Sequence, residues 1–123
     1  METPRALSSA DFSNVRAVFT DVDGTLTSPH RLHGSTLTSI EQLAAAGIKV
    51  VLVSGRSAGW AECWLRQLPV EGVIAENGGV YWAKNAQGHL YKVFAEKRAR
   101  QLANRNRLKK WVAQAMKQVP GAR

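Results

Sequence analysis

Two aspartates separated by one residue, Asp21 and Asp23, are the side chains in this sequence best suited to chemistry. They stand in the run Asp-Val-Asp-Gly-Thr, where Gly24 lets the backbone turn closely around a bound group. One carboxylate can attack a substrate while the other transfers a proton, and a carboxylate that attacks a phosphate ester forms a covalent acyl-phosphate. Such a reaction needs positive charge around the transferred group, and Mg²⁺ suits a site built from oxygen ligands. The pair therefore predicts magnesium-assisted phosphoryl transfer.

This run also fits two other interpretations. A calcium loop of the EF-hand type would have glycine at its sixth position and glutamate at its twelfth, where this chain has Leu26 and Leu32. A plain Asp/Gly turn after a strand is the stronger alternative. The other polar motifs of the chain, and their positions, favour chemistry over a turn.

Two further motifs follow apolar segments, and each has a structural as well as a functional interpretation. Ser54 and the amide of Gly55 can donate hydrogen bonds to a phosphate oxygen, or can simply cap the helix that follows. Arg56 can equally contact phosphate or form a structural ion pair. Asn77, in Glu-Asn-Gly-Gly, can bind phosphate or only begin a tight turn. Because each motif follows a predicted strand, all should meet at the edge where parallel strands end and ligands bind.

Alternating strands and helices are predicted to hold these motifs in place. Short runs rich in β-branched residues predict strands at 15–20, 48–53 and 72–75. One helix is expected to begin with a cap at Ser35 or Thr36 and to stop at Gly47, and a second should run over about 58–68. This order predicts an α/β fold with a Rossmann-like open parallel sheet. A β-hairpin around 85–88 and a basic amphipathic helix over 96–119 should follow.

The size and charge of the chain limit its organisation and partners. Its 123 residues suit one domain, with an irregular arm at 1–14, a core at 15–95 and the basic helix in 96–123. Residues 1–83 contain six Lys/Arg and eight Asp/Glu, whereas residues 84–123 contain eleven Lys/Arg and one Glu, which together give the net charge of +8. One cysteine, no export signal and no long apolar stretch lead us to expect a cytoplasmic protein without a membrane segment.

Together the motifs resemble the haloacid dehalogenase (HAD) superfamily. Residues 21–27 match its first motif, Asp-x-Asp-Gly-Thr-Leu-Thr, and Ser54 matches its second, a Ser or Thr after a hydrophobic strand. The run at 76–79 is similar to the Cof-type subfamily (IIB), which has a large cap inserted after the third strand and includes sucrose-phosphate and mannosyl-phosphoglycerate phosphatases. The resemblance covers about residues 15–94.

The resemblance implies a role for each matching residue. Asp21 would be the nucleophile and a Mg²⁺ ligand, and Asp23 the general acid/base, with its backbone carbonyl also on the metal. Ser54, Gly55 and Asn77 would bind the phosphoryl group. The substrate would be a small phosphorylated metabolite such as a sugar phosphate.

One departure from the family leads to a further expectation. The family also uses a downstream lysine and then an acidic motif that completes the metal site, and this sequence has no Asp or Glu after Glu96. Lys109 and Lys110 lie on the basic helix and are poor candidates for that lysine. The chain is therefore expected to hold only the N-terminal portion of the core, with little or no activity. The alternative is a non-catalytic module that binds phosphate or another polyanion, including nucleic acid, through the basic helix.

Overall fold

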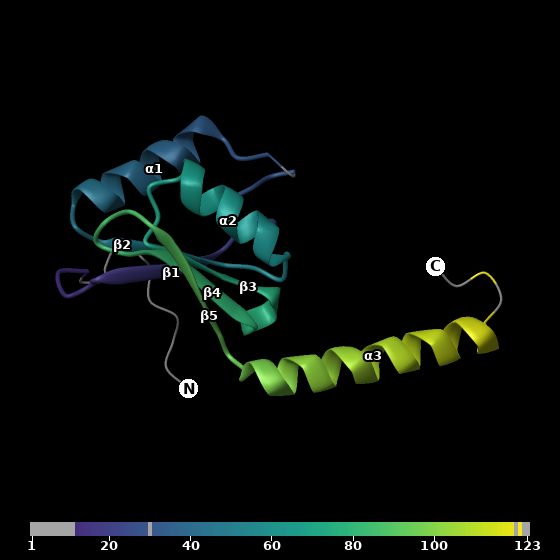
Figure 1. Cartoon of the computed structure of the whole chain (residues 1–123). Helices are drawn as coiled ribbons and strands as arrows, with labels where there is room; N and C mark the ends of the chain where they lie inside the picture. The colour runs from purple at the N-terminus through teal and green to yellow at the C-terminus, as the bar shows by residue number, and fades with distance from the viewer. Residues whose placement is uncertain (1–11, 30, 120, 122–123) are drawn as a thin grey trace, which may run out of the picture.

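Strands and helices alternate along the chain in the computed structural model, which describes residues 12–29, 31–119 and 121 (Figure 1). The elements are β1 (Ala17–Asp21), α1 (Gly34–Ala45), β2 (Lys49–Val53), α2 (Ala58–Gln67), β3 (Gly72–Ala75), the 3₁₀ turn η2 (Glu76–Gly78), β4 (Val80–Lys84), β5 (Leu90–Phe94) and α3 (Arg98–Gln118).

The five strands form one open sheet in the order β1-β2-β3-β4-β5. The first three strands are parallel, and β4 and β5 add to β3 as an antiparallel hairpin. In the hairpin loop the Asn85 side-chain oxygen accepts hydrogen bonds from the amides of Gln87 and His89, at 3.0 and 2.9 Å. The predicted α/β fold, with its hairpin and C-terminal helix, is therefore confirmed.

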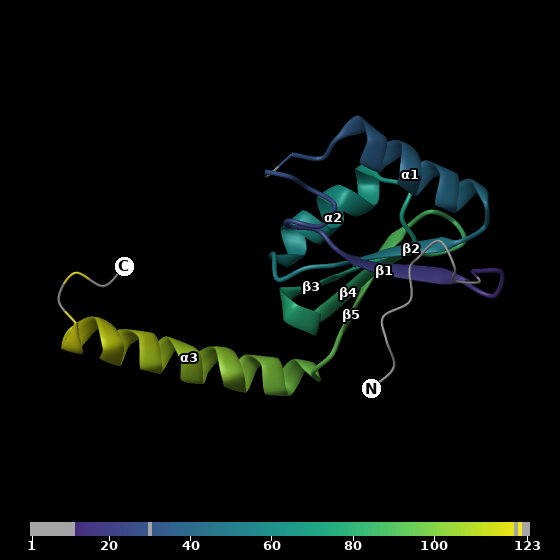
Figure 2. The ribbon, with the colours of Figure 1, turned by 180° about the vertical axis from the view of Figure 1, so that it is seen from behind.

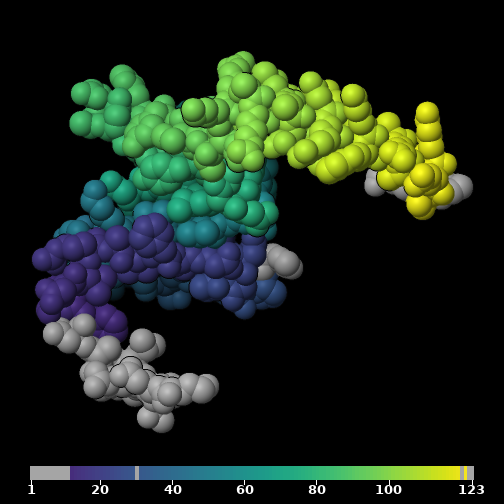
Figure 3. Space-filling view, turned by 90° about the horizontal axis from the view of Figure 1, so that it is seen from below, coloured from purple at the N-terminus to yellow at the C-terminus, as the bar shows by residue number. Residues whose placement is uncertain are grey.

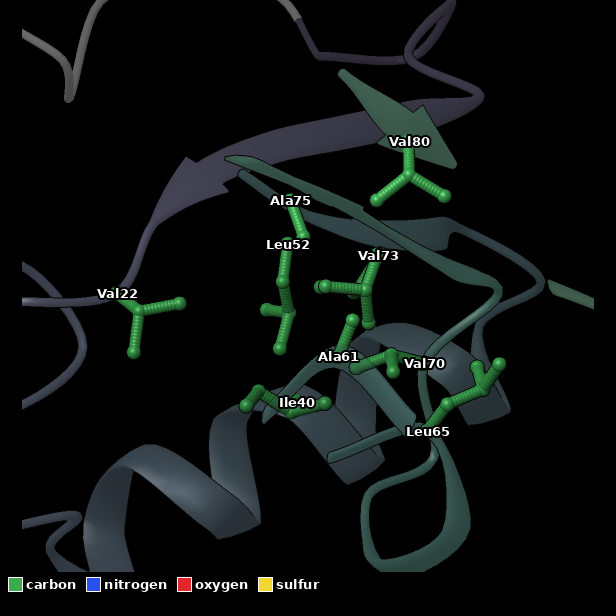
Figure 4. Close-up of a cluster of buried hydrophobic side chains, with 10 residues drawn as sticks. Val22, Ile40, Leu52, Ala61, Leu65, Val70, Val73, Ala75 and Val80 are labelled. Carbon is green, nitrogen blue, oxygen red and sulfur yellow. The ribbon is translucent and has the colours of Figure 1, made fainter. Parts of the chain in front are cut away.

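The hydrophobic core lies between one face of the sheet and the helices α1 and α2 (Figures 1 and 2). Alternate strand residues point to this face because side chains alternate along a strand. From the helices, Ile40, Ala61 and Leu65 meet them and are at most 2 % exposed (Figure 4). The strand residues of this cluster are Val50, Leu52, Val73, Ala75 and Val80. Burial of each large aliphatic side chain contributes about 1.5–3 kcal/mol, which fixes α1 and α2 on this face.

The start of α1 differs from the expectation. His33 is the N-terminal cap residue, with no capping hydrogen bond from its side chain, and Ser35 lies within the first turn, as does Thr36. The imidazole of His33 instead contacts the carbonyl of Ser28, so the preceding loop rather than a side-chain cap leads into the helix. At the other end Gly47 has φ +76° and its amide donates to the Ala44 carbonyl, as the predicted stop requires.

The last helix, α3, projects away from the rest of the molecule (Figures 1 and 2). None of its residues is buried. Its first turns are joined to the preceding loop by an ion pair of Arg100 with Glu96 at 3.3 Å and by a hydrogen bond from the Gln101 side chain to the Glu96 carbonyl at 2.7 Å. Of the predicted arm at 1–14, only residues 12–14 lie within the described part, and they form a turn. Within that part, no helix is long and apolar enough to span a membrane.

Candidate functional site

The carboxyl ends of the three parallel strands meet at one edge of the sheet. Asp21, the last residue of β1, is in register with Val53 at the end of β2. Ser54 follows directly, and its amide donates to the carbonyl of Ile74 on β3 at 2.9 Å. Asn77 comes two residues after the end of β3, and its amide lies 3.4 Å from the carbonyl of Ser54. The structure thus brings Asp21, Ser54 and Asn77 to the same edge.

The loop after β1 winds around a single carbonyl, that of Val22. This oxygen accepts hydrogen bonds from three successive amides and from the Thr27 hydroxyl at 3.1 Å. The Val22 side chain is only 5 % exposed and anchors the loop in the core, while Gly24 makes the turn with φ +84°. The run at 21–27 therefore folds as one unit, in which a buried valine and a threonine hold the two aspartates in place.

The carboxylate of Asp23 is bound by both nitrogens of one edge of the Arg56 guanidinium. Arg56 Nε donates to Oδ2 at 2.8 Å and the terminal nitrogen donates to Oδ1 at 2.6 Å. This hydrogen-bonded carboxylate raises the pKa of Arg56 above its ordinary value. Of the two interpretations of Arg56, the structure thus shows the ion pair, and it identifies the partner as the proposed acid/base.

Arg56 is supported from its other side by an aromatic ring of α2. Its guanidinium carbon lies 4.4 Å from the centre of the Trp60 ring, and Trp60 in turn lies 5.6 Å from Trp64. Cation–π contacts of this kind hold a guanidinium in a fixed orientation. Sequence reasoning missed Trp60 as part of the site, although Trp60 lies in the first turn of α2, which begins two residues after Arg56.

Ser54 is the one buried polar side chain of the described residues, at 4 % exposed. Its hydroxyl oxygen accepts a hydrogen bond from the amide of Arg56 at 3.1 Å. Gly55 is packed closely against Asn77: a Cβ atom at position 55 would lie 2.9 Å from the Asn77 side-chain oxygen. Glycine is therefore needed where the loops after β2 and β3 approach each other.

The turn after β3 is held in an uncommon backbone conformation. Glu76 and Asn77 both have positive φ, +54° and +53°, which costs about 1–3 kcal/mol for each non-glycine residue. Two hydrogen bonds offset this cost: the Glu76 amide donates to the Arg56 carbonyl at 2.9 Å, and its carboxylate accepts from the Ala58 amide at 3.2 Å. The N-terminus of α2 is thus capped by Glu76 and not by Ser54, whose capping role was the structural alternative.

The oxygen ligands at this edge do not by themselves complete a magnesium site. Among the described residues no three of His, Cys, Asp and Glu are grouped so that they could hold a metal ion. The carboxylate of Asp23 is paired with Arg56, which leaves the Asp21 carboxylate and the Asp23 carbonyl as the expected ligands. Magnesium requires near-octahedral oxygen coordination, so most positions would have to be filled from outside this set.

Comparison with known proteins shows which proteins this chain is similar to. Residues 18–116 match the haloacid dehalogenase-like hydrolase family. A phosphoglycolate phosphatase of Methanoculleus marisnigri is 38 % identical over 69 residues, which is 54 % of this chain and 30 % of the relative. A second, from Methanospirillum hungatei, is 41 % identical over the same shares of the two chains.

Solved structures show the same fold. A haloacid dehalogenase-like hydrolase from B. subtilis superimposes with a TM-score of 0.60 at 23 % identity, over 82 % of this chain and 34 % of that one. The chain therefore spans only about a third of the length of these proteins. Because the family match covers most of this chain, the chain belongs to the haloacid dehalogenase-like hydrolases.

Proposed function

We propose that this chain carries the nucleophile of a Cof-type phosphatase that hydrolyses small phosphate monoesters. The supporting observation is the position of Asp21 at the sheet edge beside Ser54 and Asn77. Its side chain is exposed, and no group of the described residues donates a hydrogen bond to its carboxylate. A carboxylate left open to a substrate, next to donors that can bind phosphate, is what nucleophilic phosphoryl transfer requires.

The proposed reaction has two steps. An Asp21 oxygen attacks phosphorus and forms an acyl-phosphate, while the bond from phosphorus to the ester oxygen breaks and Asp23 gives that oxygen a proton. Water then attacks the phosphorus of the acyl-phosphate and gives a proton to Asp23. The bond between phosphorus and the Asp21 oxygen breaks, which releases phosphate and restores Asp21 as a carboxylate. The Ser54 hydroxyl, the Gly55 amide and Asn77 would bind the phosphoryl oxygens. Mg²⁺, when bound by the complete site, would supply positive charge for the transferred group.

Arg56 has a proposed part in this cycle through its contact with Asp23. The bidentate contact fixes the direction of the carboxylate, because two parallel hydrogen bonds allow one orientation. It also brings positive charge to the leaving-group side of the site. The contact would therefore hold Asp23 in one orientation and favour its ionised, proton-accepting form, with Trp60 packed against the other side of the guanidinium.

The substrate is proposed from the relatives and from the subfamily motif. The two methanogen relatives are named for phosphoglycolate, a small phosphorylated acid, and the turn at 76–79 is similar to that of sugar phosphatases. Small phosphorylated acids and sugars are the substrates to test first. We propose that the protein acts on them in the cytoplasm.

The test is hydrolysis of an aryl phosphate and of phosphoglycolate by the purified chain with Mg²⁺ present. We expect turnover only slightly above the uncatalysed rate, lost in Asp21→Asn. Glu62→Gln, a carboxylate-to-amide change on the exposed side of α2, is the matched control and should leave the rate unchanged. Turnover that survives in Asp21→Asn would show that another group is the nucleophile.

A second candidate function is the binding of a polyanion by α3. The helix carries seven Lys/Arg and no Asp/Glu, and its side chains are almost all exposed. Binding to single-stranded RNA or DNA that weakens steeply with added salt would support it, since such binding is driven by counterion release. Equal binding by a variant with four of these cations changed to glutamine would argue against it.

A further inference from the structure

One face of the sheet is apolar and is covered by no helix of the described chain. The helices α1 and α2 both lie on the opposite face, and Figure 3 views the molecule from the uncovered side. Cross-strand register places two rows of side chains here. The first row is Phe19, Val51, Gly72, Ala83 and Tyr91, and the second is Asp21, Val53, Ile74, Tyr81 and Val93. We call these ten residues the open face.

The open face is only partly protected by its own side chains. The ring of Tyr81 lies over Gly72, where an added Cβ would be 2.5 Å from it, which helps to keep the centre of the face buried. Toward the rims, Phe19 is 64 % exposed and Val93 is 54 % exposed. An apolar hollow of about 230 Å³ is lined by Ile74, Tyr81 and Val93, among others. Sheets with parallel strands are normally covered on both faces, so this surface is an expected docking site.

The last half of α3 carries a second apolar surface, here called the α3 stripe. Its residues recur at helical spacing on one side of the helix, and all are 55–56 % exposed. They are Leu108, Trp111, Val112 and Met116, together with Val119 directly after the end of the helix. A helix stripe of this kind is stable only when it is buried against another element. The chain therefore exposes one helix stripe and one sheet face, which are the two partners of an α/β layer.

We propose that two copies of this chain associate reciprocally, with the α3 stripe of each copy packed on the open face of the other. A two-fold symmetric pair satisfies both surfaces at once, because each copy contributes one helix and one sheet. The projecting α3 is directed away from its own sheet and so is free to reach a second molecule (Figures 1 and 2). This inference does not depend on the proposed phosphatase function.

Charge favours this arrangement over direct pairing of the two helices. Each α3 has seven basic residues and no acidic one, so a pair of α3 helices would bring two strongly positive surfaces together. Described residues outside α3 carry eight Lys/Arg and seven Asp/Glu, so the body of the chain is close to neutral. The open face holds the carboxylate of Asp21, and Lys49, which continues the same face of β2 beside it, is paired with Glu71 at 2.8 Å. A helix of one copy therefore meets less repulsion on the sheet of the other than on a second helix.

The test measures mass in solution as a function of chain concentration, by sedimentation or light scattering. We expect a dimer for the native chain and at least about tenfold weaker association for Trp111→Asp and for Phe19→Asp, since buried aromatic anchors dominate interfaces. Asn106→Asp adds the same charge on the polar side of α3 and is the control for Trp111→Asp; it should remain dimeric. Circular dichroism checks that each variant is folded.

A mixing experiment distinguishes the reciprocal dimer from other assemblies. An equimolar mixture of Trp111→Asp and Phe19→Asp retains one intact helix-on-sheet contact and should associate more tightly than either variant alone. If Phe19→Asp alone is as dimeric as the native chain, the helices pair directly and the proposal is wrong. A native chain that stays monomeric at high micromolar concentration, or binds vesicles of anionic lipid through Trp111 as a monomer, would also overturn it.

Discussion

Arg56 connects the three motifs that sequence reasoning identified separately. Its guanidinium binds Asp23, its amide donates to the Ser54 hydroxyl oxygen, and its carbonyl accepts from the Glu76 amide. The position of Asp21 and Ser54 at one edge could be predicted, because the ends of parallel strands share an edge. The Arg56–Asp23 pair could not, since the two residues are 33 positions apart and nothing in the spacing of either motif indicates the other.

Replacement of Arg56 by methionine should change the environment of Trp60 far more than the stability of the fold. The ion pair is partly exposed, with side-chain exposures of 33 % and 41 %, so its loss should lower the free energy of unfolding by about 1 kcal/mol or less. Removal of the cation from the Trp60 ring should, however, shift the tryptophan fluorescence. Urea unfolding and emission spectra measure the two effects.

The control for this prediction is Arg66→Met, which breaks an ion pair with Glu62 on the same helix. It should have a similarly small effect on stability and leave the emission spectrum unchanged. Identical spectra for native chain, Arg56→Met and Arg66→Met would show that Arg56 does not lie against Trp60 in solution.

The elements that hold the site were predictable where their apolar pattern is regular. The β-branched runs of β1, β2 and β3 and the stop of α1 at Gly47 follow from side-chain period and backbone preference. The predicted start of α1 was wrong. The helix begins at Gly34, and His33 contacts the preceding loop in place of the side-chain cap expected at Ser35 or Thr36. The packing of Tyr81 over Gly72 depends on the register of two strands, which sequence period alone does not determine.

Substitution of Gly72 by alanine should destabilise the sheet through a clash with Tyr81. The new Cβ would lie 2.5 Å from the Tyr81 ring, closer than van der Waals contact permits, and overpacking of this kind costs about 1–3 kcal/mol. Thermal or urea unfolding measures the loss. The double variant Gly72→Ala/Tyr81→Ala should show no further penalty from the glycine change, because the ring is absent.

Gly59→Ala is the matched control for this prediction. Gly59 lies within α2, and the nearest atom to an added Cβ is 3.9 Å away, so alanine should stabilise the helix by up to about 1 kcal/mol. If Gly72→Ala is as well tolerated as Gly59→Ala, Tyr81 does not cover position 72.

At the scale of the whole molecule, the described residues combine two aspartates at the sheet edge with two apolar surfaces that no described element covers. Sequence reasoning predicted the α/β fold and the basic helix, but an amphipathic pattern shows only that a helix has an apolar side, not what covers it. The sequence also limits which carboxylates could bind a metal ion, since no Asp or Glu follows Glu96. Both features give predictions about the behaviour of the isolated chain.

Magnesium should bind this chain weakly, with a dissociation constant of about 1 mM or higher. Only the Asp21 carboxylate and the Asp23 carbonyl are expected as protein ligands, and two oxygens do not compensate for the loss of water from Mg²⁺. Titration calorimetry measures the affinity. Tight one-to-one binding that disappears in Asp21→Ala would mean that an unidentified acid completes the site; Glu76 is then the first residue to test, by Glu76→Gln.

Turnover by the isolated chain should be close to background, and supplying the remainder of a relative should raise it. Phosphoryl transfer depends on charge neutralisation at the transferred group, and loss of one preorganised electrostatic contact commonly lowers the rate about 10²–10³-fold. In this sequence the downstream lysine that the family resemblance implies cannot be assigned, and no Asp or Glu after Glu96 could act as the second metal carboxylate. The chain matches 30 % of the Methanoculleus marisnigri relative, so a chimera that joins it to the unmatched part of that protein tests the point directly. We expect the chimera to hydrolyse phosphoglycolate in a reaction that requires both Mg²⁺ and Asp21, and the same chimera with Asp21→Asn to be inactive.

Two outcomes would contradict this prediction. Hydrolysis at ordinary enzyme rates by the isolated chain would show that the downstream lysine and the second metal carboxylate are not needed. A folded chimera without activity would show that the Asp21 site is not a phosphatase site.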